Sequence, residues 1–173
     1  SNWTYELGLK TRFMDNRIVL SGDIFYIDWE NIQIQSAIPG STISVNVNSG
    51  GATSSGIGVD ATAYITDRFS IRGAIALINP EYKNGVRDGE VFSPCGELVG
   101  TRVIVSGCSS LVSGNQLART TATQIALNVN YSIPDVIGDF EFYARGDYSY
   151  QESNYNLSLN QANQGDINLL NLR

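Results

Sequence analysis

Hydrophobic and polar residues alternate along the chain with a period of two, most clearly over residues 57–77. Between residues 69 and 77 the odd positions are apolar or Gly, and the even positions are small or charged. Residues 57–65 alternate in the same way, and Thr66–Arg68 supplies a short connection. Successive side chains of a strand point to opposite faces, so each segment predicts a strand with one apolar face. Together they predict a β-hairpin whose strands share an apolar side.

The same period predicts five further strands. They cover residues 5–13, 18–26, 121–131 and 140–150, and a last strand begins at Ile167. Asp15–Asn16 and Pro134–Asp139 predict short turns, whereas polar stretches at about 38–51, 81–118 and 152–166 predict long connections. The alternation blurs over Tyr26–Glu30. This indicates either a β-bulge or the exit of the strand from the environment that covers its apolar face.

These elements predict an all-β fold, an antiparallel up-and-down meander of about seven strands without helices that forms part of a transmembrane β-barrel. Short and long connections alternate strictly, which places the short turns at one end and the long loops at the other. Outer-membrane barrels have this asymmetry. The strands run to about 10 residues, the length that a tilted strand needs to cross a bilayer, whereas globular strands usually have about 5 or 6.

An aromatic residue on the apolar side stands within three residues of each short turn. These residues are Phe13, Phe69, Tyr131 and Phe140. Rings that repeat at one height form a girdle at a membrane interface, so we interpret the four as a lipid-facing girdle. The alternative is that aromatic residues are simply common in strands.

Charged residues occupy the opposite side of the predicted strands. We assign Glu6, Lys10, Arg12, Asp60, Arg72, Glu141, Arg145 and Asp147 to a lumen-facing set. They are candidates for contact with a plug or a passing solute. Because both signs of charge occur in adjacent strands, pairing across strands explains them equally well, and for any single residue this structural role is the stronger expectation.

Composition excludes several kinds of function. The chain has 17 Asp and Glu against 11 Lys and Arg, a net charge of -6, and no basic stripe for nucleic acid. It has no His, which removes His-based catalysis and the usual zinc sites, so we expect neither an enzyme nor a resident cofactor or metal. The chain begins with Ser rather than Met, and we interpret it as an excised or processed piece.

Cys95 and Cys108 are the only cysteines, and both lie in the long connection predicted over residues 81–118. In an extracellular or periplasmic setting such a pair favours a disulfide. Closing a loop of this size would contribute about 3 kcal/mol on the chain-entropy model. Two free thiols are the alternative.

Three stretches resemble the barrel of TonB-dependent outer-membrane receptors. They are Tyr5-Glu-Leu-Gly-Leu-Lys-Thr11, Ile24-Phe-Tyr-Ile-Asp-Trp-Glu-Asn-Ile-Gln33 and Ala52-Thr-Ser-Ser-Gly-Ile-Gly-Val-Asp60. They follow one another in the order and spacing of that family, although Gly58 stands where the family usually has Glu. The resemblance covers about residues 2–80 by sequence and the remainder by architecture only.

The resemblance implies that residues 1–173 are a partial β-barrel domain from the bacterial outer membrane, without the plug domain and the remaining barrel strands. It also implies a lipid bilayer, the protein's own plug and TonB as partners. The solute would be large and scarce, of the siderophore, cobalamin or carbohydrate class. Unpaired sheet edges are not tolerated in hydrocarbon, so we expect the isolated fragment to self-associate.

Two other classes of protein remain open from the sequence. A small soluble β-barrel of the lipocalin kind would turn its apolar faces inward around a ligand. An outer-membrane enzyme or adhesin is the third possibility, and the absence of His argues against a hydrolase.

Overall fold

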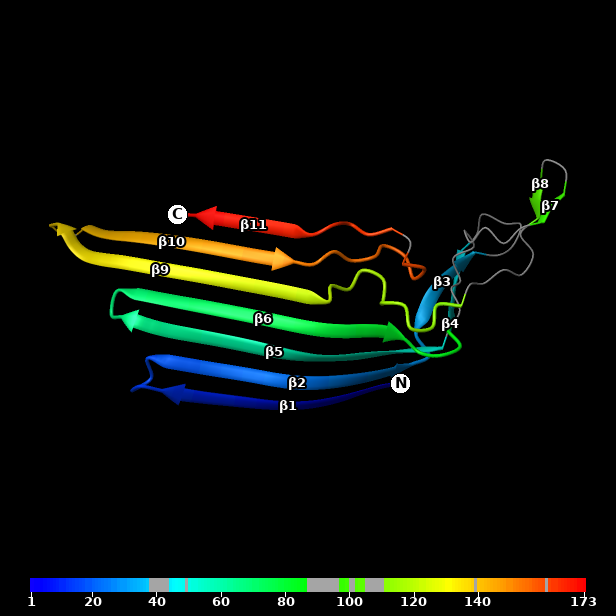
Figure 1. Ribbon diagram of the computed structural model, residues 1–173, viewed down its shortest axis with the longest axis horizontal. Coiled ribbons are helices and arrows are strands. Elements are labelled where there is room, and N and C mark those ends of the chain that lie inside the picture. Colours follow the sequence, from blue (N-terminus) through cyan, green and yellow to red (C-terminus); the bar gives the residue numbers. More distant parts are fainter. Residues whose placement is uncertain are drawn as a thin grey trace.

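One seven-stranded antiparallel sheet dominates the structure, a computed structural model that describes residues 1–37, 44–48, 50–86, 97–99, 102–104, 111–138, 140–160 and 162–173 (Figure 1). Its strands are β1 (Asn2–Phe13), β2 (Ile18–Glu30), β5 (Gly51–Thr66), β6 (Phe69–Tyr82), β9 (Thr123–Ile137), β10 (Phe140–Gln151) and β11 (Ile167–Leu172), which lie side by side in this order. The part of the chain that the structure describes contains no helix. The predicted all-β meander of seven strands is therefore confirmed, and the sheet is open, with β1 and β11 at its edges.

Two small hairpins lie outside this sheet. One pairs β3 (Gln33–Ala37) with β4 (Ser44–Asn48), and the other pairs β7 (Glu97–Val99) with β8 (Arg102–Ile104). Most of this part of the chain was expected to form irregular connections, and that expectation was wrong. Val45 and Val47 do alternate with Ser44, Asn46 and Asn48, so β4 carries a readable period of two, but it is short and lies in a polar stretch rich in Ser, Asn and Gly.

Short turns and long connections lie at opposite ends of the sheet, as predicted (Figure 1). The turn between β1 and β2 uses three consecutive residues in the left-handed region, Met14, Asp15 and Asn16, with φ of 50°, 53° and 69°. Asp and Asn tolerate this region better than most residues. The end with the three short turns is called the turn end below, and the opposite end is called the loop end.

The pairing register is continuous over the first four strands at their centre. Leu7 lies opposite Ile24, Ile24 opposite Ile57, and Ile57 opposite Leu77. The register continues without a shift to the pair Glu30 and Gly51, so the bulge considered for Tyr26–Glu30 is not present.

The turn predicted over Pro134–Asp139 was placed too early. β9 continues to Ile137, and its register against β10 is irregular between the pairs of Phe140 and Phe142. Pro lacks the N–H that a regular ladder needs and is found at irregular or edge positions. The proline therefore marks this irregularity rather than the end of the strand.

Among the described residues, the buried hydrophobic side chains gather at the loop end instead of between two layers. They are Ile32, Ala52, Tyr82, Val86 and Val112, with Leu117 and Leu159 packed against them. Backbone hydrogen bonds hold this cluster together: the N–H of Val112 donates to Val86 at 2.9 Å, and that of Gly114 donates to Tyr82 at 3.0 Å. Part of the connection predicted as irregular is thus hydrogen-bonded to the loop end of β6.

Candidate functional site: the two faces of the sheet

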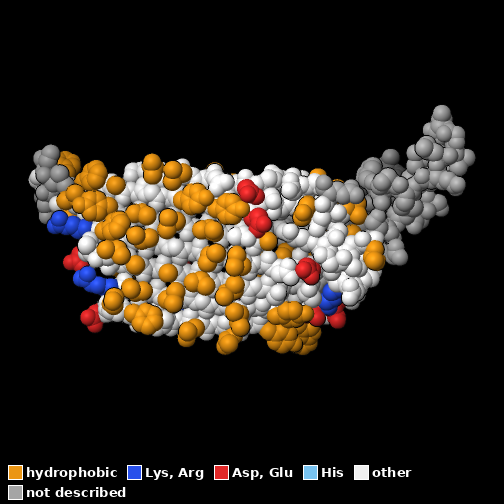
Figure 2. All heavy atoms as spheres, in the orientation of Figure 1, with side chains coloured by type: hydrophobic (Ala, Val, Ile, Leu, Met, Phe, Trp, Pro, Cys, Tyr) orange, Lys and Arg blue, Asp and Glu red, His pale blue; other side chains and the backbone are white. Residues whose placement is uncertain are grey.

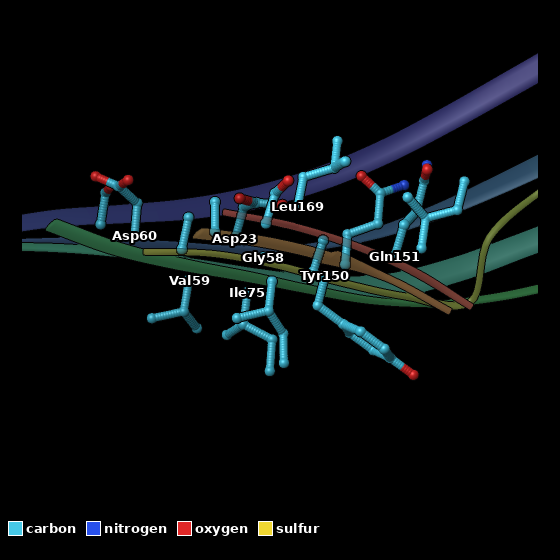
Figure 3. A pocket seen from close by; sticks show the side chains of 16 residues that line it. Asp23, Gly58, Val59, Asp60, Ile75, Tyr150, Gln151 and Leu169 are labelled. Carbon is cyan, nitrogen blue, oxygen red and sulfur yellow. The ribbon is translucent and has the colours of Figure 1, made fainter. Parts of the chain in front are cut away.

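The register sorts the side chains of the seven strands onto two chemically different faces. Residues that lie directly opposite each other share a face, so the chain of partners Leu9, Gly22, Val59, Ile75, Ile125 and Tyr150 defines an apolar face. The partners Lys10, Ser21, Asp60, Ala74, Ala126 and Ser149 define a polar face. Figure 3 shows the separation directly: Asp23 and Asp60 point to one side of the sheet, and Val59, Ile75 and Tyr150 point to the other.

The side chains of the apolar face are exposed rather than packed. Leu7 and Leu9 on β1 are 72% and 73% exposed, and Ile75 and Leu127 in the middle of the sheet are 38% and 42% exposed. On the face seen in Figure 2, hydrophobic side chains spread over the strands, whereas charged side chains gather at the turn end and in the half nearer the loops. Soluble monomers rarely expose an apolar surface of this extent, so something else must cover it.

The four predicted girdle residues all lie at the turn end. Phe13 ends β1, Phe69 begins β6, and Phe140 begins β10. Tyr131 lies opposite Phe69, and their ring centroids are 6.4 Å apart in an edge-to-face arrangement. The structure brings these two rings together as a contact pair.

On the polar face, one predicted cross-strand ion pair is present. The Nε of Arg72 on β6 lies 2.9 Å from Oδ2 of Asp60 on β5. The side chains of Arg72 and Asp60 are 63% and 32% exposed, so water weakens their attraction. The pair balances two charges of the polar face, and both side chains stay in contact with solvent.

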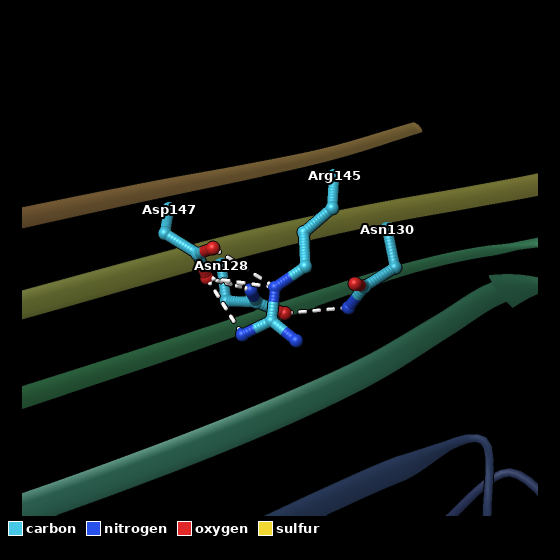
Figure 4. Close-up of polar contacts among 4 residues, drawn as sticks. All are labelled: Asn128, Asn130, Arg145 and Asp147. Carbon is cyan, nitrogen blue, oxygen red and sulfur yellow. Dashed lines mark hydrogen bonds and ion pairs between the residues drawn. The ribbon is translucent and has the colours of Figure 1, made fainter. Parts of the chain in front are cut away.

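A second ion pair runs along one strand instead of across two. Nη2 and Nε of Arg145 lie 2.8 Å and 2.9 Å from the two carboxylate oxygens of Asp147, two residues further along β10. The link to the next strand is made by amides: Asn128 on β9 donates to Asp147, and Asn130 donates to Asn128 (Figure 4). Arg145 and Asp147 thus pair with each other along β10, and only the amide of Asn128 links them to the neighbouring strand.

The other members of the predicted set stay apart. Glu6, Lys10, Arg12 and Glu141 are exposed, and none forms an ion pair with a residue that the structure describes. Their charges are therefore available to a partner on the polar face. Sequence reasoning missed Asn128 and Asn130, although two Asn residues at alternate positions of one strand are a readable signal for a polar ladder.

At the loop end the two faces exchange their character. Lys83, just after β6, forms an ion pair with Asp28 on the otherwise apolar face, while the ring of Phe25 on the polar face lies against Gly56. The hydrogen bond from Lys83 to Asp28 raises the pKa of Lys83 above its ordinary value. The blurred alternation over Tyr26–Glu30 was the signal for this change: the strand leaves the apolar region there.

Other candidate chemistry is limited. Cys95 and Cys108 lie outside the described residues, so their bridge stays a prediction. In the described ranges, no group of three or more His, Cys, Asp or Glu side chains could hold a metal ion. Likewise, no helix among those residues is long and apolar enough to cross a membrane.

Comparison with known proteins decides the family. The model of the family described as TonB dependent receptor-like, β-barrel, matches residues 1–173. The chain belongs to this family. No curated protein matches the chain.

Solved TonB-dependent receptors have the same fold over nearly the whole chain. The ferric yersiniabactin uptake receptor FyuA from Yersinia pestis is 19% identical with a TM-score of 0.69, and the match covers 99% of this chain and 22% of that receptor. The siderophore receptor PiuA from Acinetobacter baumannii is 20% identical with a TM-score of 0.66, over 99% and 21% of the two chains. The ferric preacinetobactin receptor BauA from the same species is 14% identical with a TM-score of 0.65, over 99% and 22%. The chain therefore spans about a fifth of the length of these receptors.

Proposed function

We propose that this chain is a wall segment of a TonB-dependent receptor in the bacterial outer membrane, with its apolar face toward lipid and its polar face toward the lumen. The observation that carries the proposal is the separation of apolar and polar side chains that continues from β1 to β10 below the loop end, with long connections at one end only. Apolar side chains on the outside and polar ones inside are the pattern of a barrel that spans a bilayer.

The lumen side would act together with parts of the receptor beyond this segment. Glu6, Lys10, Arg12 and Glu141 offer charges that no described residue neutralises, so they are the better candidates for contact with a plug or a solute. Arg72 and Arg145 already have carboxylate neighbours and serve mainly to balance charge in the wall. Energy would come through TonB, as the family membership suggests, and the protein would be a transport component rather than an enzyme.

A siderophore is the solute class that the comparisons support best. All three receptors reported above carry a siderophore or a ferric siderophore in their description. The test is growth of a strain that lacks the full-length receptor, with each of several ferric siderophores as the only iron source. Growth restored by the receptor gene in a TonB-dependent manner supports the assignment, and unchanged iron uptake for all of them contradicts it.

The soluble lipocalin-like alternative gains no support. It requires Ile71, Ile75, Leu127 and Val129 to enclose a dry centre. The sheet is open, and Ile75 and Leu127 are more than a third exposed. For the isolated fragment, the two open edges at β1 and β11 together with the exposed apolar face favour self-association.

The orientation of the faces can be tested with two neighbouring positions. In the full-length receptor with Cys95 and Cys108 replaced by Ser, Ile75→Cys and Ala74→Cys are each labelled with a bimane fluorophore and reconstituted into vesicles that contain brominated lipid. We expect strong quenching at position 75 and little at position 74, because adjacent residues of a strand point to opposite faces. The reverse result, or equal quenching, contradicts the proposed orientation.

A further inference from the structure

An arginine at the turn end has no acidic partner among the residues that the structure describes. The turn between β5 and β6 contains Asp67 and Arg68. Asp67 is approached by Arg17 of the neighbouring turn, whose Nη2 lies 3.6 Å from Oδ1 of Asp67. Arg68 is exposed, and its guanidinium forms no ion pair with a described residue at this end of the sheet.

The backbone of Arg68 is nevertheless held in place. Its N–H donates to Oγ1 of Thr66 at 3.2 Å, and its carbonyl oxygen accepts from the N–H of Ser132 on β9 at 2.9 Å. The second bond ties the turn to the strand that carries Tyr131. The guanidinium thus extends from a fixed point beside the ring pair of Phe69 and Tyr131.

These residues surround an open hollow. It has a volume of about 650 Å³ and is lined by Thr66, Asp67, Arg68, Phe69 and Tyr131. This volume falls within the range of about 300–1,000 Å³ that is usual for small-molecule sites. The two rings contact each other edge to face with their planes at 65°, and both belong to the apolar face. A cation, two aromatic rings and an apolar surface therefore meet at one height.

We propose that this hollow binds the phosphodiester headgroup of an anionic phospholipid from the leaflet at the turn end; this inference rests on the proposed function, which turns the apolar face toward lipid. The planar guanidinium of Arg68 matches a phosphate in a bidentate manner. Phe69 and Tyr131 supply rings at headgroup level, where aromatic side chains are favoured, and the acyl chains continue along the apolar face. Arg17 offsets the negative charge of Asp67, which would otherwise repel the phosphate.

The test is a lipid titration followed by native mass spectrometry on the full-length receptor in detergent, with phosphatidylglycerol as the probe. We expect Arg68→Gln to weaken the tightest phosphatidylglycerol binding about tenfold, the size of a charge-assisted phosphate contact. The comparison variant is Arg17→Gln, which leaves the charge of Asp67 unbalanced but removes no side chain that lines the hollow, so it should weaken binding by a clearly smaller factor. Unchanged binding in Arg68→Gln, or equal losses in both variants, overturns the proposal.

A second variant should change phosphatidylglycerol binding in the opposite direction. Among the described residues that line the hollow, Asp67 is the only acidic one; Asp67→Asn removes its charge and frees Arg17, so binding should strengthen severalfold. Weaker or unchanged binding overturns the proposal, even where Arg68→Gln fails to fold. If Arg68→Gln lowers the melting temperature equally with and without lipid, Arg68 has an internal partner and the proposal is wrong. The quenching assay described above separates this failure from a failure of the proposed function, because it reports orientation whether or not Arg68 binds lipid.

Discussion

A charge placed on the apolar face tests the membrane orientation through its dependence on depth. Ile75 lies six residues beyond Phe69, about 20 Å along the strand at about 3.3 Å per residue. With a strand tilt of about 40°, this is about 15 Å above the ring of Phe69, near the middle of a hydrocarbon core of about 30 Å. Ile71 lies on the same face but only two residues beyond Phe69, about 5 Å above it by the same reasoning.

An arginine should therefore lower the free energy of unfolding by different amounts at positions 71 and 75. We expect Ile75→Arg to lower the free energy of unfolding by about 2–4 kcal/mol and Ile71→Arg to lower it by about 1 kcal/mol or less, because the penalty falls toward the interface. Ala74→Arg on the polar face is the matched control. Its side chain would enter the aqueous side near Asp60, so we expect a change of about 0.5 kcal/mol or less.

The assay is chemical unfolding of the full-length receptor in phospholipid vesicles, followed by tryptophan fluorescence. Equal losses for Ile71→Arg and Ile75→Arg would refute the reasoning, because a packed protein core penalises a charge without regard to bilayer depth. A larger loss for Ala74→Arg than for Ile75→Arg would show that the two faces are assigned the wrong way round.

Three further predictions concern single contacts. A Cβ added to Gly56 would lie 2.6 Å from both the Leu77 carbonyl oxygen and the Phe25 ring, so Gly56→Ala should destabilise the receptor by about 1–3 kcal/mol. Gly73→Ala is the control, because the nearest atom to its added Cβ is 4.0 Å away, and a comparison of the unfolding midpoints of the two variants tests the prediction. The raised pKa of Lys83 means that its bond to Asp28 stabilises fully below the ordinary value of 10.5 and that this contribution is lost as pH rises through the higher folded-state value. Thermal melts of wild type and Lys83→Met should therefore converge above that pH, and a constant difference contradicts the assignment. If Cys95 and Cys108 form a disulfide, a thiol reagent should label the unfolded receptor only after reduction; labelling before reduction shows free thiols.

The strands could be predicted from sequence because a period of two assigns each side chain to a face. The alternation in Ile57–Ile65 and Phe69–Leu77 therefore predicts both the hairpin and its apolar side, and the pairing confirms them. The parts of the strands near the loop end were harder to predict. Beyond the apolar region the two faces no longer meet two different environments, so apolar and polar residues need not alternate there. Phe25 faces the otherwise polar side and Asp28 the otherwise apolar side without any change in backbone pairing.

The candidate contacts were less predictable than the strands. Arg145 and Asp147 lie two residues apart on one face, and sequence alone does not tell whether a flexible guanidinium turns along its own strand or across to the next. In the structure the guanidinium turns along its own strand, and Asn128 occupies the position opposite Asp147 and donates to it. Likewise, the packing of Val112 against the loop-end cluster depends on contacts distant in sequence.

The hydrogen bond between Val112 and Val86 has a consequence for how such receptors can diversify. It joins the two ends of a long connection, and neighbouring bonds fasten the same segment to the top of β6. Whatever lies between the two ends can be exchanged, lengthened or shortened without altering the length or the pairing of the wall strands. The sequence of this connection and the pairing of the seven strands can therefore be inherited as separate modules.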